Sequence, residues 1–187
     1  LSQPIKGTAK RGVNIEEDKK LLYNLKNSQK EISENIMITD LVRNDLSITA
    51  LRSSVHVEEL CEVYTFAKVH QMITTISSVV DNKLDVSELL KSVFPMGSMT
   101  GAPKLKAMEL IDQYEEFSRG LFSGSVGYIT PDGDFDFNVI IRSIIYNNKL
   151  KYLSVGVGSA ITIKSDPEKE YEECLVKLRP IIESLKT

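Results

Sequence analysis

The tract Gly97-Ser98-Met99-Thr100-Gly101-Ala102-Pro103-Lys104 combines residue types that could bind an anion. Two glycines and two hydroxyls form a tight loop, and the run from Pro103 onward predicts a helix over 103–115. Proline fits a first helical turn because its missing N–H would be unbonded there. Free N–H groups at the helix start, with Lys104 nearby, favour a negative ligand. The spacing is not that of a P-loop, so a carboxylate is as good a candidate as a phosphate, and a capped helix start without a ligand is the alternative.

A second candidate site lies near the end of the chain. Glu170 and Glu173 stand three apart in a helical pattern, and Lys177 follows four residues later on the same face. Two carboxylates on one helical face can hold a divalent cation such as Mg²⁺, and Lys177 could then reach a substrate carboxylate. The alternative is an ordinary salt-bridged face in contact with solvent.

Three further features could contact a small anionic ligand. Gly156 and Gly158 interrupt an apolar run, where glycine indicates either close approach of a ligand or a β-bulge. Arg142 follows an apolar strand and suits bidentate carboxylate binding, although an acidic neighbour could occupy it instead. Tyr128 follows a glycine and could be a core residue or offer its hydroxyl to a ligand.

Lys6, between Ile5 and Gly7, is a candidate nucleophile. An amine reacts when burial or another cation keeps it unprotonated, although a lysine in a loop is more often a solvated charge. His70 is one of two histidines, and we expect it to be structural rather than a base.

The elements expected to position these groups form an α+β pattern. Helical spacing covers 16–33, 86–93, 103–115 and 167–185, whereas residues 1–12 indicate a basic loop and 36–38 could be strand or helix. Strands are expected at 63–66, 72–76, 124–130, 135–146 and 150–163. Turn residues at 131–134 and 147–148 join the last three strands into an antiparallel meander. We therefore expect antiparallel β-sheets with flanking helices.

Composition narrows the class of protein. The 187 residues, 42% of them hydrophobic, suffice for one sizeable core, so we expect one domain over 1–187. The net charge of −3 and the lack of a basic stripe argue against nucleic acid, and no apolar run reaches the roughly 20 residues of a membrane span. The distant pair Cys61 and Cys174 favours a reducing compartment, hence the cytoplasm. The chain has no signal peptide and opens on Leu1, so we expect part of a longer protein.

Several tracts occur together and in order as they do in one enzyme family. The chain resembles the chorismate-utilising enzymes, which include anthranilate synthase component I, aminodeoxychorismate synthase component I, isochorismate synthase and salicylate synthase. The tracts are Pro4-Ile5-Lys6-Gly7-Thr8, residues 34–46 from Glu34-Asn35 to Asp45-Leu46, Phe94-Pro95 through Lys104, Gly124-Ser125-Val126-Gly127-Tyr128, and the stretch from Glu170 to Lys177.

The resemblance implies an α+β fold of packed sheets and helices around chorismate and Mg²⁺, in a chain whose N-terminal half is missing here. Its metal ligands fall on Glu34 and Glu173, with Glu170 beside them, and these carboxylates are expected to meet around one ion facing Lys6. Its catalytic and substrate positions fall on Lys6, Thr8, Thr100, Gly101, Tyr128, Arg142, Gly156, Gly158 and Lys177. Electrostatic stabilisation by the metal would favour loss of the C4 hydroxyl of chorismate.

Lys6 decides between branches of the family. Anthranilate synthases usually carry alanine there, whereas aminodeoxychorismate synthases often carry lysine, which is thought to attack C2 before ammonia adds at C4. We therefore expect 4-amino-4-deoxychorismate as the product, on the route to p-aminobenzoate and folate. The alternatives are anthranilate synthase, isochorismate or salicylate synthase, and an inactive fragment that only folds or binds partners.

Two departures from the family pattern and one absence complete the comparison. Ala9-Lys10-Arg11 stands where the family often has Arg-Pro-Arg, which puts one basic contact in doubt, and Gln71 stands where anthranilate synthases place a histidine. The chain shows no Cys-His-Glu glutaminase pattern. Ammonia is therefore expected from a separate glutamine amidotransferase subunit.

Overall fold

The computed structural model describes residues 1–163 and 165–186. The chain divides into two compact units, Leu1–Tyr114 and Glu115–Thr187, and each is considered by itself. The first unit contains, in chain order, β1 (Ile5–Lys10), α1 (Ile15–Lys26), α2 (Gln29–Ser47), β2 (His56–Thr65), β3 (Val69–Ser77), α3 (Val86–Val93), η1 (Gly97–Met99, a 3-10 turn) and α4 (Lys104–Tyr114).

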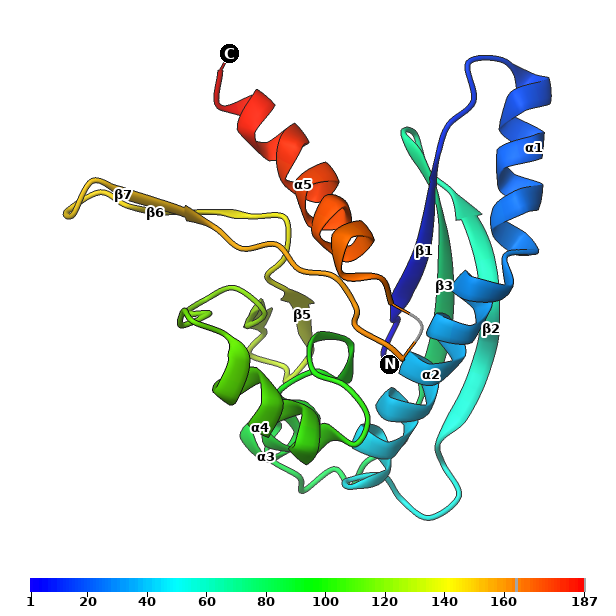
Figure 1. Cartoon of the computed structure of the whole chain (residues 1–187). Coiled ribbons are helices and arrows are strands. Elements are labelled where there is room, and N and C mark those ends of the chain that lie inside the picture. Colours follow the sequence, from blue (N-terminus) through cyan, green and yellow to red (C-terminus); the bar gives the residue numbers. More distant parts are fainter. Residues whose placement is uncertain (164, 187) are drawn as a thin grey trace. The chain divides into compact units, whose positions relative to one another are not determined.

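An antiparallel sheet of order β1-β3-β2 forms the centre of the first unit (Figure 1). Helix α2 packs on β1 and β3, and α1 packs on the same sheet. Alternate residues of β3 point toward the helices and are fully buried, as expected of a central strand. The buried apolar side chains are Leu25, Ile38, Leu46, Met72, Ile73 and Ile76.

Side-chain caps set the starts of the first two helices. The Asn14 side chain accepts from the N–H of Glu17 at 2.9 Å, and the Ser28 hydroxyl accepts from the N–H of Glu31 at 3.4 Å. Such caps satisfy N–H groups that lack partners inside the helix. The predicted single helix over 16–33 was therefore wrong, because Ser28 begins a second helix there.

The structure also decides two other predictions for the first unit. Residues 1–12 are not a simple loop, because Ile5–Lys10 hydrogen-bonds to β3 as an edge strand. The ambiguous residues 36–38 are helical, since they lie within α2, whose buried positions, Asn35, Ile38, Thr39, Asp45 and Leu46, share one helical face. Strands β2 and β3 and helices α3 and α4 confirm the other predictions for this part of the chain.

The second unit contains β4 (Ser125–Ile129), β5 (Phe135–Val139), β6 (Ile144–Asn147), β7 (Tyr152–Val155) and α5 (Pro167–Ser184). Strands β4 and β5 form one hairpin and β6 and β7 another. Gly133, at φ 91°, makes the turn after β4, as the run 131–134 predicted. Asp166 caps α5, and Pro167 occupies its first turn.

The expected meander was wrong in detail. Residues 135–146 are not one strand, because the chain leaves extended geometry at Arg142, whose φ is 50°. The two hairpins are consequently separate two-stranded sheets. The strand expected over 150–163 is limited to β7.

The helices of the described residues, 1–163 and 165–186, include none with the length and apolar character to cross a membrane.

Candidate active site

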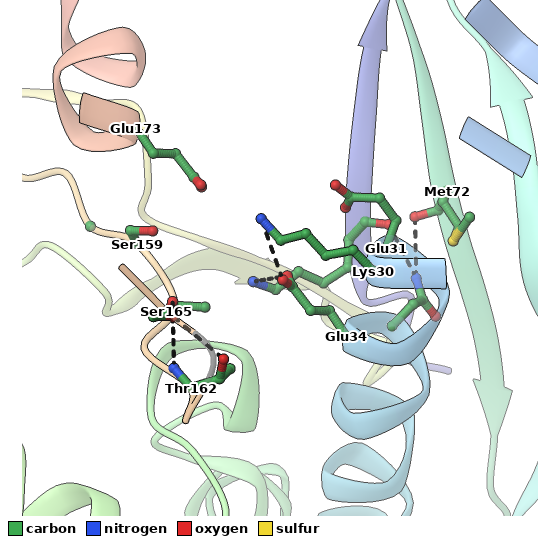
Figure 2. Close-up of polar contacts among 12 residues, drawn as sticks. Lys30, Glu31, Glu34, Met72, Ser159, Thr162, Ser165 and Glu173 are labelled. Carbon is green, nitrogen blue, oxygen red and sulfur yellow. Dashed lines mark hydrogen bonds and ion pairs between the residues drawn. The ribbon is translucent and has the colours of Figure 1, made fainter. Parts of the chain in front are cut away.

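The amine of Lys6 and the carboxylate of Glu34 face each other in the first unit. Lys6 Nζ lies 3.8 Å from Glu34 Oε2, and the two side chains are 26% and 20% exposed. Lys6 comes from β1 and Glu34 from α2, so the packing of the helix on the strand brings them together. Lys30, one turn earlier on α2, approaches the other Glu34 oxygen at 3.9 Å (Figure 2). Glu34 thus faces Lys6, while its convergence with Glu173 around one ion stays a prediction.

Thr8 lies on the same strand, opposite Gln71 of β3. Its side chain is exposed. It stands two residues beyond Lys6 on the edge strand, and its substrate contact stays a prediction.

The loop of the first sequence motif is tied down by its own hydrogen bonds. The Thr100 hydroxyl donates to the Met96 carbonyl at 3.1 Å. Gly101 packs against the first turn of α4, since a Cβ at this position would lie 3.0 Å from the Ala107 methyl. Thr100 and Gly101 are thus held at the start of α4, as predicted, and neither is deeply buried.

Lys104 has a different role from the one its position suggested. Its Nζ lies 2.7 Å from Oδ1 of Asp45, a carboxylate that is only 5% exposed. The lysine charge is therefore matched inside the fold and does not serve an anion at the helix start. This corrects the idea that Lys104 adds to an anion site there.

The acidic face of α5 carries two sets of polar contacts within the second unit. Lys177 Nζ donates to Glu173 Oε1 at 2.6 Å and to the Gly158 carbonyl at 2.9 Å. Ser159 donates a short hydrogen bond to Glu170 Oε2. Three predicted residues, Lys177, Gly158 and Glu173, thus meet at one place.

Gly156 has a packing reason that sequence reasoning missed. A Cβ there would lie 2.2 Å from Cγ of Phe122, so only glycine lets the ring approach the backbone. Gly158 has no such restriction, because the nearest heavy atom to a Cβ there is 4.0 Å away. Arg142 lies in the link between β5 and β6, and the Tyr128 side chain on β4 is 62% exposed.

The candidate metal ligands fit Mg²⁺ by chemistry, since all are carboxylates, the oxygen donors that this ion prefers. Glu34 is paired with two lysine ammonium groups and Glu173 with one, so a bound metal ion would share these carboxylates with the lysines or replace the lysines there. Within the part of either unit that the structure describes, no three His, Cys, Asp or Glu side chains form a cluster. The meeting of Glu34 with Glu173 stays a prediction, because the two residues belong to different units.

A partly buried polar network fastens α1 to the sheet. His70 is fully buried, its Nε2 lies 3.0 Å from Asp18 Oδ1, and its Nδ1 lies 2.9 Å from the Thr65 hydroxyl. Arg11 donates two hydrogen bonds to the Asp18 carboxylate at 2.8 Å each. These bonds, with one from the Gly12 N–H, hold the pKa of Asp18 well below its usual range. The contacts agree with a structural role for His70.

One protein-family model matches nearly the whole chain. The family model described as chorismate binding enzyme matches residues 1–183. The chain belongs to the chorismate binding enzyme family. The matched range includes residues of both units and all the predicted site residues. The assignment of 1–187 to a single catalytic domain stays a prediction.

Named relatives of this chorismate binding enzyme are similar over nearly all of its length. It is 45% identical over 178 residues, 95% of the chain, to the aminodeoxychorismate synthase, chloroplastic, of Arabidopsis thaliana, of which it covers 19%. It is 41% identical over 184 residues, 98% of the chain, to aminodeoxychorismate synthase component 1 of Escherichia coli K12, of which it covers 40%. The chain therefore spans less than half the length of these curated relatives.

A solved structure confirms the α+β fold. The crystal structure of anthranilate synthase component I from Streptococcus pneumoniae TIGR4 matches with a TM-score of 0.83 and 32% identity, over 96% of this chain and 39% of that one. The antiparallel sheets with flanking helices expected from the sequence are thus the architecture of this family.

Proposed function

We propose that this chain is the chorismate-converting part of an aminodeoxychorismate synthase component I. It would convert chorismate and ammonia to 4-amino-4-deoxychorismate. The observation that carries the proposal is the Lys6 amine 3.8 Å from Glu34, in a chorismate binding enzyme. The identities to the Arabidopsis and Escherichia coli aminodeoxychorismate synthases support the same branch of the family.

Lys6 would act as a covalent catalyst. Lys6 attacks as the free amine: its Nζ–C2 bond forms as the ring double bonds shift and the C4–O bond breaks, and the proton lost from Nζ leaves with the hydroxyl as water. Ammonia then bonds to C4 as the Nζ–C2 bond breaks, and the proton that the ammonia nitrogen loses goes to the departing Nζ, which releases lysine as the free amine. Two easier displacements replace one difficult substitution. The Glu34 carboxylate would hold the amine at the reacting carbon and balance its charge when it is protonated.

Glu34, Glu170 and Glu173 would hold Mg²⁺, because their carboxylates are the hard oxygen donors suited to it. When bound, the ion would supply electrostatic stabilisation of the substrate carboxylate and of the departing hydroxyl. Calorimetric titration of the chain with Mg²⁺ tests this assignment. Glu34→Gln and Glu173→Gln should each weaken binding, whereas Glu109→Gln, an exposed carboxylate paired with Lys106, should not.

The remaining site residues would bind chorismate. Arg142 suits a substrate carboxylate because its guanidinium can donate two parallel hydrogen bonds. Lys177 is held beside Gly158 and could exchange its contact with Glu173 for a second carboxylate. Thr8, Thr100, Gly101, Tyr128 and Gly156 complete the proposed contacts.

Ammonia would come from a glutamine amidotransferase subunit. The Escherichia coli relative is named component 1, which supports a second component for this chain as well. Both cysteines of this chain are free thiols, in keeping with a reducing compartment, and we propose the cytoplasm.

A product assay tests the proposal. The protein, in the longest form in which it is made, is incubated with chorismate, ammonia and Mg²⁺, and the products are separated by chromatography. We expect 4-amino-4-deoxychorismate, and we expect Lys6→Ala to lower its rate by several orders of magnitude, as loss of a nucleophile does in other enzymes. Lys30→Ala is the matched control, because Lys30 also faces Glu34 but is 65% exposed.

Other outcomes of the assay distinguish the alternatives. Anthranilate as the product would make the chain an anthranilate synthase. Turnover without ammonia, to isochorismate or salicylate, would assign it to the water-using branch. A Lys6→Ala variant that still forms 4-amino-4-deoxychorismate at the normal rate would remove the covalent role. Failure of the 187 residues to bind chorismate by calorimetry, beside binding by a longer form, would show that this part alone is incomplete.

A further inference from the structure

Lys6 lies in a break of the β-ladder. Ile5 of β1 is opposite Ile73 of β3, and Thr8 is opposite Gln71, so Lys6 and Gly7 together face the single residue Met72. This is a β-bulge, in which one extra residue bends the strand and redirects its side chains. Gly7 has φ 93°, a conformation that glycine adopts most easily. The direction of the Lys6 side chain therefore depends on the bulge.

One buried amide bridges this break. Asn35 follows Glu34 on α2 and is 1% exposed. Its Nδ2 donates to the Lys6 carbonyl at 3.4 Å and to the Met72 carbonyl at 3.4 Å. The Met72 end of this bridge is visible in Figure 2. The two strands are therefore linked across the bulge by the helix residue next to Glu34.

The orientation of the Asn35 amide follows from its neighbours. Carbonyl oxygens can only accept, so the NH₂ group must face Lys6 and Met72. On the other side, the Thr74 hydroxyl donates a short hydrogen bond to Asn35 Oδ1. Thr74 is free to donate its proton because its oxygen accepts from the Cys61 N–H at 3.0 Å.

Cys61 completes the surroundings of the amide oxygen. Its thiol donates to Asn35 Oδ1 at 3.5 Å, and burial raises the pKa of this thiol, so it keeps its proton. Both ends of the Asn35 side chain are thus engaged, and buried amides whose groups are all bonded are rigid. The bulge is held from α2 by a side chain that has little freedom to move.

We propose that Asn35 is a positioning residue for Lys6. By bonding the Lys6 carbonyl it fixes the bulge and so keeps the Lys6 amine directed at Glu34. The catalytic consequence rests on the proposed function, but the positioning itself does not, and the two can be tested separately.

The positioning is tested by the reactivity of the lysines without any substrate. Lysine amines are labelled with a trace amount of acetic anhydride, and the rate at each site is read by mass spectrometry relative to Lys106. An amine held in an ion pair is less available to the reagent, and Lys6 Nζ lies 3.8 Å from Glu34 Oε2, so Glu34→Gln should speed labelling of Lys6 by about twofold to fivefold. In an Asn35→Leu background, Glu34→Gln should leave the Lys6 rate within about 1.3-fold, because the amine no longer faces residue 34.

Lys30 supplies the internal control. It reaches Glu34 along α2 itself, four residues away, and not through the bulge. Its response to Glu34→Gln should therefore be the same in both backgrounds, which a general loosening of the fold would not give. Thr39→Val is a second control. The Thr39 hydroxyl bonds the Asn35 backbone carbonyl at 2.8 Å and lies 3.5 Å from Asn35 Oδ1, so its loss leaves the donors Thr74 and Cys61 on the amide oxygen and the bond from Nδ2 to the Lys6 carbonyl, and the response of Lys6 should persist.

An equal response of Lys6 to Glu34→Gln with and without Asn35 would overturn the proposal. If Asn35→Leu does not fold, Asn35→Ser can replace it in the labelling test, because serine is smaller than asparagine and fits the same space. In the product assay, Asn35→Leu should lower kcat more than tenfold and change KM for chorismate less than threefold. A lost labelling response in a protein that makes another product would uphold the positioning and reject the proposed function.

Discussion

Lys104 Nζ lies 2.7 Å from Asp45 Oδ1, and this ion pair fastens the glycine loop to α2. The side chains are 20% and 5% exposed. The backbone comes close at the same place, since a Cβ on Gly97 would lie 2.9 Å from Cβ of Leu41. The loop that carries Thr100 and Gly101 is therefore anchored on the helix that carries Glu34.

Breaking this pair should destabilise the fold. Lys104→Met leaves the Asp45 carboxylate buried without its partner, which should lower the free energy of unfolding in urea by about 3 kcal/mol. Lys106→Met is the control, because Lys106 pairs with Glu109 at 2.8 Å on the same helix but both side chains are more than 60% exposed, so its loss should cost below about 0.5 kcal/mol. Equal losses for the two variants would contradict the anchor.

Asp18 should make stability depend on acid pH. The pKa of its carboxyl is held well below the usual range, chiefly by the Arg11 hydrogen bonds and then by the Gly12 N–H. A carboxyl with a lowered pKa in the folded state stabilises the protein above the unfolded value, about pH 4, and the contribution disappears as pH falls further.

Urea unfolding of Asp18→Asn at several pH values measures this effect. We expect the variant to be less stable than the parent by a constant amount between pH 7 and pH 5, and the gap to shrink below about pH 4. Asp40→Asn, which removes an exposed pair with Arg43, should show little difference at any pH. A gap for Asp18→Asn that stays constant down to pH 2 would show that its charge is not the cause.

Gly7 should tolerate substitution less well than another glycine of similar φ. Gly7 (φ 93°) and Gly133 (φ 91°) share the backbone strain that alanine would suffer, about 1 kcal/mol. At Gly7 an added Cβ would also lie 3.2 Å from Leu25 and from Glu31, whereas at Gly133 nothing lies within 4 Å. Gly7→Ala should thus lower the melting temperature further than Gly133→Ala does. An equal drop in melting temperature for the two variants would show that the contacts with Leu25 and Glu31 have no effect.

Substitution of Gly156 tests whether side-chain packing or the close approach of a ligand requires glycine at this position. Gly156→Ala should be strongly destabilising, by about 2 kcal/mol or more, because its Cβ would overlap the Phe122 ring. Adding Phe122→Ala should recover part of the stability that Gly156→Ala removes, and the interaction energy of this cycle measures the contact. If the losses of unfolding free energy from the two substitutions simply add in urea denaturation, Phe122 is not the reason for glycine at position 156. The approach of a ligand would then be the remaining explanation.

Local chemistry explains the elements that were predicted correctly. Helix α3 matches the periodic stretch 86–93, and the turn at 131–134 lies between β4 and β5 as its residues indicated. These features depend on contacts a few residues apart, which periodicity and turn residues report directly. The acidic face of α5 belongs to the same class, because Glu173 and Lys177 are neighbours on one helix.

The predictions of secondary structure were wrong where contacts between residues distant in sequence, or the backbone conformation of one residue, set the bounds of a strand. Residues 5–10 lack a strong strand pattern, but they become a strand because β3 supplies hydrogen bonds along their edge. Arg142 stands within an apolar run, and only the left-handed backbone at this residue divides that run into β5 and β6.

The sequence by itself determined the class of fold, the family, and which residue types could do chemistry, because motif order and periodicity are properties of the chain alone. Only the tertiary structure decided that Lys104 serves Asp45, that Gly156 makes room for Phe122, and that Asn35 bonds the carbonyl of Lys6 from 29 positions away. Such contacts have no local signature, since a buried asparagine and a solvated one read the same until packing shows which carbonyls lie within reach.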